Sequence, residues 1–248
     1  MPIEDATPNN AKRFQHKIED GVIVLILVAA SVLFYLLFFS TQAYSHEIFP
    51  VYLVQIKRDN LEITNGRDFL KETKSGFLTI DGHQSRAVEK TGQAKTTMIQ
   101  FRYRGPASSA RNTSPSGQIG LKLRAKNGCN LLYVMWVVGP EERLKVQMKS
   151  NPGDVNHEDC GTCGYTTLVP ESNANPFPPI SSVTDQKTHR LLAKLEPLDG
   201  NDYRLIVYAD WKEVWRGIIR DMPPEIEGPA GIRTDGGNFI FRFFTDNI

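Results

Sequence analysis

Apolar and polar residues alternate with a period of two along much of the chain beyond residue 96. Because successive side chains of a β-strand point to opposite faces of its sheet, this alternation predicts strands that are buried on one face. Residues 130–138 (NLLYVMWVV) are instead apolar at almost every position, which is typical of a central strand covered on both faces. The alternating segments are residues 97–103, 118–125, 144–149, 189–195, 203–209, 213–219 and 238–245.

Short turn sequences separate the segments of the chain. Asp-Gly and Asn-Gly pairs occur at 81–82 and 127–128, an Asn-Pro-Gly triplet at 151–153, and an Asp-Gly-Asn-Asp run at 199–202. Glycine, asparagine and aspartate adopt the backbone conformations that tight turns need. Many short antiparallel strands joined in this way predict a mainly β fold, an antiparallel two-sheet sandwich or jelly roll.

Residues 22–39 break the β pattern, because they form an eighteen-residue run without a charged side chain. As a helix with a rise of about 1.5 Å per residue the run would be roughly 27 Å long, close to the hydrocarbon thickness of a bilayer. The apolar core of a cleaved signal peptide is usually shorter, about 7–15 residues, and no clear cleavage motif follows at 41–45. The run therefore predicts an uncleaved transmembrane helix.

The charged residues that flank this run indicate its orientation. Lys12, Arg13 and Lys17 precede it, whereas no lysine or arginine follows it before residue 57. Positively charged flanks stay on the cytoplasmic side of a membrane. We therefore expect a single-pass membrane protein with a cytoplasmic N-terminus and an extracytoplasmic main domain, periplasmic if the cell is bacterial. The expected division is a cytoplasmic tail over 1–20, a transmembrane helix over 21–40, a juxtamembrane segment over 41–60 and a β-sandwich domain over 61–248.

The overall charge narrows the choice of partners. The chain has 29 lysine and arginine residues against 28 aspartate and glutamate residues, a formal net charge of +1. Nucleic-acid-binding domains usually carry a clear excess of positive charge, so this balance and the expected location argue against nucleic acid. The predicted partners are the lipid bilayer, through residues 22–39, and other membrane protein subunits, with a glycan as a further option.

The C-terminal residues carry a family resemblance. A strand–turn–strand segment over 207–215 (VYADWKEVW) is followed by EGPAGIRTD at 227–235 and by an aromatic strand at 238–244. This ending resembles that of concanavalin A-like lectin/glucanase and laminin-G-like sandwiches. The resemblance implies a β-sandwich but no single function, because lectins, glycosidases and adhesion modules share that fold. Many relatives have glycine in the hairpin turn where this chain has Trp211.

The sequence contains no recognisable catalytic arrangement. β-Glucanases of the concanavalin A-like fold carry carboxylates in an E-x-D-x-x-E pattern on one strand, which places acid and nucleophile on the same face. Here Glu141-Glu142 and Glu158-Asp159 are adjacent pairs that would point to opposite faces of a strand. Phosphate-binding loops, G-x-S-x-G turns and H-E-x-x-H motifs are also missing from the sequence. We therefore expect neither enzyme activity nor a cofactor.

Three cysteines and one histidine form a compact cluster of reactive side chains: Cys129, His157, Cys160 and Cys163. In an oxidising compartment Cys129 would form a disulfide with Cys160 or Cys163 and leave one thiol free. Alternatively, Cys160 and Cys163 would pair with each other in a redox-active C-x-x-C motif. All four side chains together would suit a tetrahedral zinc site. A structural disulfide is the interpretation that we favour.

Two predicted strands leave basic side chains on their polar faces. If the strands share a sheet, these cations would attract phosphates, lipid headgroups or an acidic protein surface; otherwise acidic neighbours would neutralise a solvated face. Trp211 is a further interaction candidate, because it lies at a hairpin tip, where burial is difficult. The cations are Lys122, Arg124, Lys126, Arg143, Lys145 and Lys149.

Residues 151–187 form a long segment with weak periodicity and five prolines, which is typical of a functional or docked loop. Together with the missing catalytic motifs, this segment favours a non-catalytic accessory or scaffolding subunit whose β-sandwich binds and stabilises a larger membrane protein complex. The alternative is a membrane-tethered, lectin-like carbohydrate-binding module of the cell envelope. A glycan-active hydrolase with dispersed carboxylates is the third interpretation.

Overall fold

The computed structural model of the chain describes residues 52–65, 70–108, 117–139, 142–171 and 187–246. The predicted transmembrane run at 22–39 and the flanking cations of the N-terminal tail lie outside these residues. Among the residues that are described, no helix has the length and apolar character needed to cross a membrane.

Thirteen antiparallel strands make up the described part of the chain, and the mainly β prediction is confirmed. The only helical elements among the described residues are a 3-10 turn, η1 (Arg58–Asn60), and one turn of helix, α2 (His157–Cys160). The strands are β1 (Val54–Ile56), β2 (Leu61–Asn65), β3 (Lys71–Glu72), β4 (Leu78–Glu89), β5 (Thr96–Pro106), β6 (Gly117–Ala125), β7 (Leu131–Val138), β8 (Arg143–Lys149), β9 (Tyr165–Thr167), β10 (His189–Pro197), β11 (Tyr203–Ala209), β12 (Lys212–Ile219) and β13 (Gly231–Thr245).

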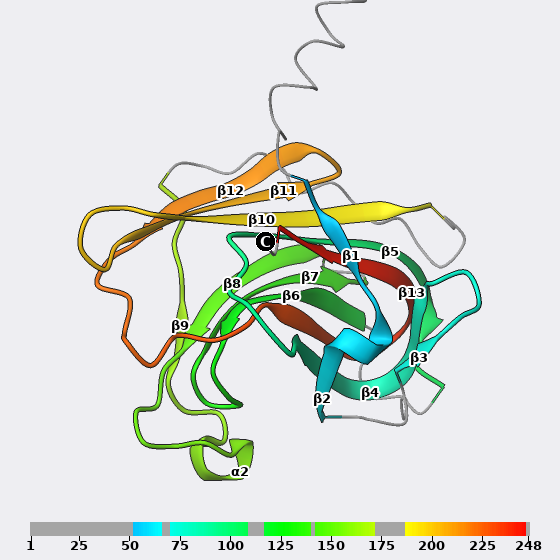
Figure 1. Ribbon diagram of the computed structural model, residues 1–248, viewed down its shortest axis with the longest axis horizontal. Coiled ribbons are helices and arrows are strands. Elements are labelled where there is room, and N and C mark those ends of the chain that lie inside the picture. The colour runs from blue at the N-terminus through cyan, green and yellow to red at the C-terminus, as the bar shows by residue number, and fades with distance from the viewer. Residues whose placement is uncertain (1–51, 66–69, 109–116, 140–141, 172–186, 247–248) are drawn as a thin grey trace, which may run out of the picture. The chain divides into compact units, whose positions relative to one another are not determined.

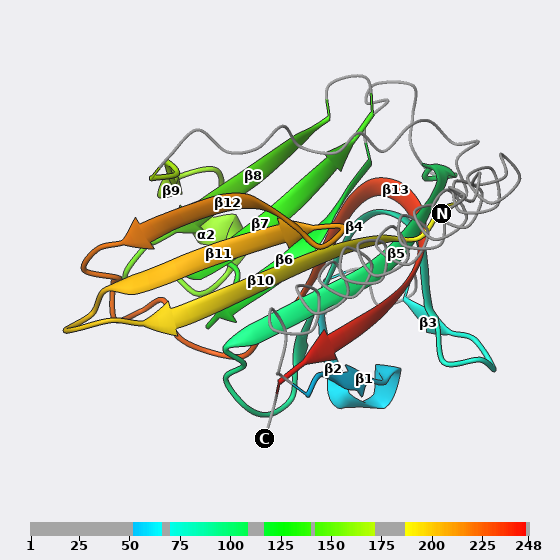
Figure 2. The same ribbon diagram turned by 90° about the horizontal axis from the view of Figure 1, so that it is seen from above.

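The strands are linked by hydrogen bonds in the order β12-β11-β10-β5-β13-β6-β7-β8-β9, and β4 pairs with β13 beside this path. The sheet curls, so that β10, β11 and β12 form a layer over β6, β7 and β8 (Figure 1). Figure 2, a view from above, shows that the strands of the two layers run in roughly the same direction. The two layers of the expected sandwich are therefore present, although one continuous ladder of strands connects them.

Strand β13 connects the two layers. Its first half, up to Asp235, pairs with β4 on one edge and β6 on the other, and its second half pairs with β5 in place of β6. The change occurs at Gly236 and Gly237, and Gly236 has a positive φ of 65° that glycine adopts without steric cost. Odd-numbered side chains point away from the main core before this bend, as Arg233 does, and into the core after it, as Phe239 does.

The main core lies between the layers and consists of apolar side chains from both. Trp136 of β7 is fully buried and packs edge-on against Phe101 of β5, with ring centroids 5.5 Å apart. Phe239, Phe241 and Phe243 of β13 are also fully buried. A second, smaller cluster lies on the opposite face of β7 and contains Val88, Ala125, Leu131, Tyr133 and Met135.

Each strand predicted from periodicity is confirmed, with boundaries that differ by at most three residues except in β13, which begins at Gly231 instead of residue 238. The expectation that residues 130–138 form a doubly covered strand is also confirmed, because every residue of β7 is buried. The turn expected at Asp81-Gly82 is wrong, because both residues lie inside the twelve-residue strand β4. In addition, β1 and η1 fall within the range 41–60 that the sequence assigns to a juxtamembrane segment.

The alternation along β13 predicts unequal costs for two neighbouring substitutions. Phe241→Ala should lower the free energy of unfolding by about 3–5 kcal/mol, because it leaves a cavity beside Phe101 and Leu78, its register partners. Ile240→Ala, at a half-buried position on the other face, should cost clearly less. Chemical denaturation of both variants measures the difference, and equal losses would contradict the assignment of faces.

Candidate functional site

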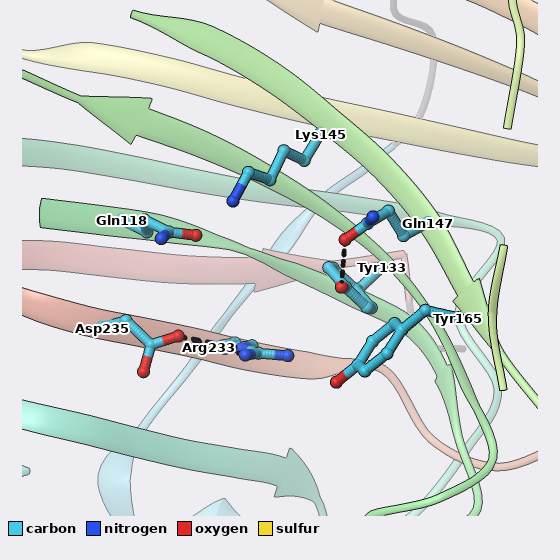
Figure 3. Close-up of a pocket in the computed structure, with 7 residues that line it drawn as sticks. All are labelled: Gln118, Tyr133, Lys145, Gln147, Tyr165, Arg233 and Asp235. Carbon is cyan, nitrogen blue, oxygen red and sulfur yellow. Dashed lines mark hydrogen bonds and ion pairs between the residues drawn. The ribbon is translucent and has the colours of Figure 1, made fainter. Parts of the chain in front are cut away.

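A pocket of about 320 Å³ lies on the face of the sheet that points away from the main core. Five neighbouring strands, β13, β6, β7, β8 and β9, contribute its lining. The register places these side chains in rows across the sheet, since Asp235 pairs with Gln118, and Tyr133 pairs with Gln147. The lining residues are Gln118, Tyr133, Lys145, Gln147, Tyr165, Arg233 and Asp235 (Figure 3).

Two tyrosines and a glutamine form one side of the pocket. The Tyr133 hydroxyl donates a hydrogen bond to Oε1 of Gln147, whose amide nitrogen donates to Oγ1 of Thr167 over 3.0 Å. The rings of Tyr133 and Tyr165 meet edge to face, with centroids 6.3 Å apart. Burial raises the pKa of Tyr133 to about 12, with smaller effects of both signs from neighbouring charged groups, so its hydroxyl stays protonated near neutral pH.

An ion pair forms the opposite side of the pocket. Arg233 donates to Oδ2 of Asp235 from Nε over 3.2 Å and from Nη2 over 3.1 Å, and its guanidinium lies 5.1 Å from the Tyr133 ring centroid. Burial acts to lower the pKa of Arg233, but Asp235 and the two tyrosines outweigh it and raise that pKa. Among the described residues, the second carboxylate oxygen of Asp235, Oδ1, is buried without a hydrogen-bond donor.

Two further cations lie beside this ion pair on the same face. Arg86 of β4 is the register partner of Arg233, and its Nε is buried without an acceptor among the described residues. Lys122 of β6 is 3% exposed and pairs with Gly231 and Tyr133 in adjacent strands. Burial, together with the charges of Arg86 and Arg233, lowers the pKa of Lys122 to about 7. We call the face that carries Arg86, Lys122, Lys145 and Arg233 the cationic face.

The structure distributes the six cations predicted from the sequence in three ways. Lys122, Lys145, Lys149 and Arg143 lie on the pocket side of β6 and β8. Arg124 is turned to the other side, because a bulge between Lys122 and Arg124 shifts the register, and its Nη1 donates to the carbonyl of Ala94 over 2.8 Å. Lys126 is exposed beyond the end of β6. The expectation that all six share one outward face is therefore wrong at Arg124 and Lys126.

Lys149 holds the neighbouring loop instead of lining the pocket. Its ammonium group is buried, donates to the carbonyl oxygen of Gly161 over 2.8 Å, and lies 5.0 Å from the centroid of the Tyr165 ring. The same nitrogen is 2.9 Å from Sγ of Cys160. Lys149 therefore connects the cysteine-containing loop to Tyr165 at the edge of the pocket.

A disulfide joins Cys129 to Cys160 across 31 residues of sequence, and Cys163 is free and exposed. The favoured interpretation of the cysteine cluster is thus confirmed. The disulfide uses two of the four side chains considered for zinc, and the described residues contain no group of three or more His, Cys, Asp or Glu side chains suited to a metal ion. His157 instead has Nδ1 3.4 Å from the Lys149 ammonium.

Trp211 lies in the turn between β11 and β12 and is 45% exposed. Asp210 and Trp211 both have positive φ, 48° and 68°, which is the geometry of a tight type I′ hairpin turn. The guanidinium of Arg190 is 5.3 Å from the Trp211 ring centroid. Trp211 belongs to the layer of β10–β12, so it does not line the pocket.

Several pocket residues were not candidates in the sequence. Arg233 and Asp235 lie within the GIRTD segment that carries the family resemblance, and Tyr165 lies in the long loop expected to be functional. Those two signals point to the right segments without identifying the side chains. Gln118 and Gln147 lie on ordinary alternating strands, whereas Tyr133 lies on the doubly covered strand β7, one face of which could be predicted to form the floor of a groove. Only the register between strands brings the three side chains together.

No protein-family model matches the chain, and no curated protein sequence is significantly similar to it. Solved structures do resemble it in fold. Carbohydrate-binding module CBM66 from Bacillus subtilis is 15% identical, with a TM-score of 0.46 over 73% of this chain and 91% of that one. The metal-free carbohydrate recognition domain of Emp46p is 13% identical, with a TM-score of 0.48 over 77% and 89%.

A legume lectin-like domain from Entamoeba histolytica is 10% identical, with a TM-score of 0.42 over 77% of this chain and 93% of that chain. The similarity to these structures is one of fold alone. At such low identities it says nothing about the ligand of this chain.

The buried Lys122 predicts an unusual dependence of stability on pH. Its pKa is lower in the folded than in the unfolded chain. Between pH 7 and the usual pKa of lysine, Lys122 is therefore protonated in the unfolded chain and largely neutral in the folded chain. The free energy of unfolding should therefore rise by about 2 kcal/mol from this group between pH 7 and pH 9. Lys122→Met should be more stable than the wild type at pH 7 and should lack that rise.

Denaturation of wild type, Lys122→Met and the exposed control Lys126→Met at pH 7 and pH 9 measures this effect. Lys126→Met should follow the wild type at both pH values. A rise of the same size in Lys122→Met would show that other groups cause it.

Proposed function

We propose that the β-sandwich is a non-catalytic carbohydrate-binding module that holds a saccharide in the pocket of β13, β6, β7, β8 and β9. The observation that carries this proposal is the composition of the pocket. Two tyrosine rings stand beside amide, ammonium, guanidinium and carboxylate groups, all in one hollow of about 320 Å³. A sugar ring combines apolar C–H faces with hydroxyl groups that both donate and accept, and this mixture of side chains matches both properties.

Asp235 Oδ1 gives this match a specific polar contact. It is a buried acceptor with no donor among the described residues, and leaving such a group unpaired costs about 1–3 kcal/mol or more. A sugar hydroxyl donates a hydrogen bond, so it would satisfy Oδ1 while Oδ2 keeps its two bonds from Arg233. The amides of Gln118 and Gln147 offer donors and acceptors for further hydroxyls.

The same lining favours recognition over hydrolysis. Glycoside hydrolysis generally uses two carboxyl groups, one as acid and one as base or nucleophile. The residues that line the pocket include a single carboxylate, Asp235, and Arg233 already binds it. The accessory-subunit interpretation stays a prediction, with Trp211 as its surface candidate.

We further propose that the module is tethered to a membrane through residues 22–39, with its N-terminus in the cytoplasm and the sandwich outside. The uncharged run and its positive flank support this arrangement. The disulfide between Cys129 and Cys160 also supports it, because disulfides persist mainly in oxidising, extracytoplasmic compartments.

Binding of the full-length protein, purified in mild detergent, to an array of neutral and acidic oligosaccharides tests the function. Tyr165→Ala should weaken binding of the best saccharide by about tenfold, because it removes one of the two rings in the pocket. Tyr165→Phe keeps the ring and should retain most of the affinity.

Trp211→Ala is the matched control, since it removes an exposed aromatic ring from the other layer and should leave binding unchanged. Failure of the wild type to bind any saccharide on the array would refute the proposed function. Loss of binding in Trp211→Ala together with full binding in Tyr165→Ala would move the site to the β11–β12 turn.

A further inference from the structure

We propose that the saccharide bound in this pocket is acidic, and that its carboxylate or sulfate group binds to the cationic face beside Asp235. The inference rests on the proposed carbohydrate-binding function and specifies its ligand class. It follows from the positive side chains gathered on one face of β4, β13, β6 and β8, whose charge exceeds that of the acidic side chains among them.

Lys122 provides the clearest observation. Its side chain is 3% exposed, and burial is the largest cause that lowers the pKa of its ammonium group. Buried cations in proteins are normally paired, because removing a charge from water without a partner costs several kcal/mol. The positive charges of Arg86 and Arg233 lower the pKa of Lys122 further and so disfavour its protonation. An anionic ligand would offset these effects and stabilise the protonated form of Lys122.

The two arginines show the same imbalance. Arg86 and Arg233 are register partners on adjacent strands, so their side chains project from neighbouring positions of one face. Burial and the charge of Arg233 lower the pKa of Arg86, and Asp235 offsets this only in part. Nε of Arg86 is buried without an acceptor among the described residues. Guanidinium groups bind carboxylates and sulfates in well-defined hydrogen-bonded geometry, so an acidic group between them would satisfy these donors.

Lys145 extends the positive charge to the opposite wall of the pocket. It projects from β8 toward Gln118 (Figure 3). Burial, Arg143 and Arg233 lower its pKa, while Asp235 acts in the other direction. The pocket lining thus combines two cations, Lys145 and Arg233, with one carboxylate, and Arg86 and Lys122 stand next to it. Lys149 is not part of this excess, because a loop carbonyl already accepts its hydrogen bond.

The proposal separates two contacts within one ligand. Asp235 Oδ1 accepts from a hydroxyl, which any sugar can supply, whereas Arg86 and Lys122 need an anionic group, which only an acidic sugar has. A neutral saccharide would leave the two cations unpaired. Free inorganic anions would satisfy the cations without using Asp235 or the tyrosine rings.

Calorimetric titration of the full-length protein in mild detergent with four probes tests the proposal. The probes are a uronic-acid oligosaccharide, its methyl ester, a sulfated oligosaccharide of the same length, and tripolyphosphate. The charged saccharide should bind at least tenfold more tightly than the neutral ester, and this preference should shrink as salt increases, because screening weakens charge interactions. The uronate and sulfate probes distinguish the two possible sources of negative charge.

Arg86→Gln should lower the affinity for the acidic saccharide by about tenfold and change that for the ester less than twofold. Lys122→Met should lower the affinity for the acidic saccharide in the same selective way, which provides a second variant if Arg86→Gln is unstable. Arg104→Gln, at an exposed position of β5, is the matched control and should bind every probe as the wild type does.

The outcomes separate the two proposals. Equal affinity for the uronic-acid oligosaccharide and its ester would overturn the acidic-ligand inference and leave carbohydrate binding intact. Binding of none of the saccharides would refute carbohydrate binding itself. Tripolyphosphate binding as tight as that of the acidic saccharide, with the same loss in Arg86→Gln, would identify a general anion site and overturn the inference.

Discussion

The backbone hydrogen bonds of β13 are the constraint on which the rest of the structure depends. This strand pairs with β4 along one edge and with β6 and then β5 along the other, so its path determines how the sheet curls. The bend at Gly236 and Gly237 also exchanges the faces of the strand. One strand thereby supplies both Arg233 and Asp235 to the pocket and three phenylalanines to the core. Shifting its register by one residue would exchange these roles.

The electrostatic arrangement of the pocket depends on the apolar packing behind it. Folded domains are stable by only about 5–15 kcal/mol, and a buried lysine beside two arginines, such as Lys122, opposes folding. The strands that carry the cations bury Ile119, Leu121, Trp136 and Ile232 on their reverse faces. That packing fixes the backbone, so the charged side chains stay close together despite their repulsion. Unfavourable charge concentrated in a pocket is typical of functional sites.

The sequence predicted the strands well and the site poorly, for a physical reason. Periodicity depends on which face of a single strand is buried, and it correctly identified strands such as β10 and β11. It missed β4, because the core-facing residues change from even positions, Leu78 and Ile80, to an odd position, Ala87. The alternation is therefore interrupted within the strand. The site depends on contacts between strands far apart in sequence, such as Arg233 with Arg86. Arg124 shows the same limit, because a bulge that periodicity cannot detect reverses its direction.

A disulfide and Lys149 hold the cysteine-containing loop next to Tyr165 and so complete the site. Most of the lining comes from paired strands, whose rigidity holds side chains in a fixed arrangement. Tyr165 alone comes from the short strand β9 after the cysteine-containing loop, where fewer backbone bonds restrain it. The disulfide between Cys129 and Cys160 ties that loop to the start of β7, and Lys149 bridges the loop and the Tyr165 ring. Because a preorganised ring loses less entropy on binding, the disulfide would raise the affinity for the proposed saccharide as well as stabilise the loop. Disulfides persist mainly in oxidising compartments, which agrees with the proposed extracytoplasmic location of the domain.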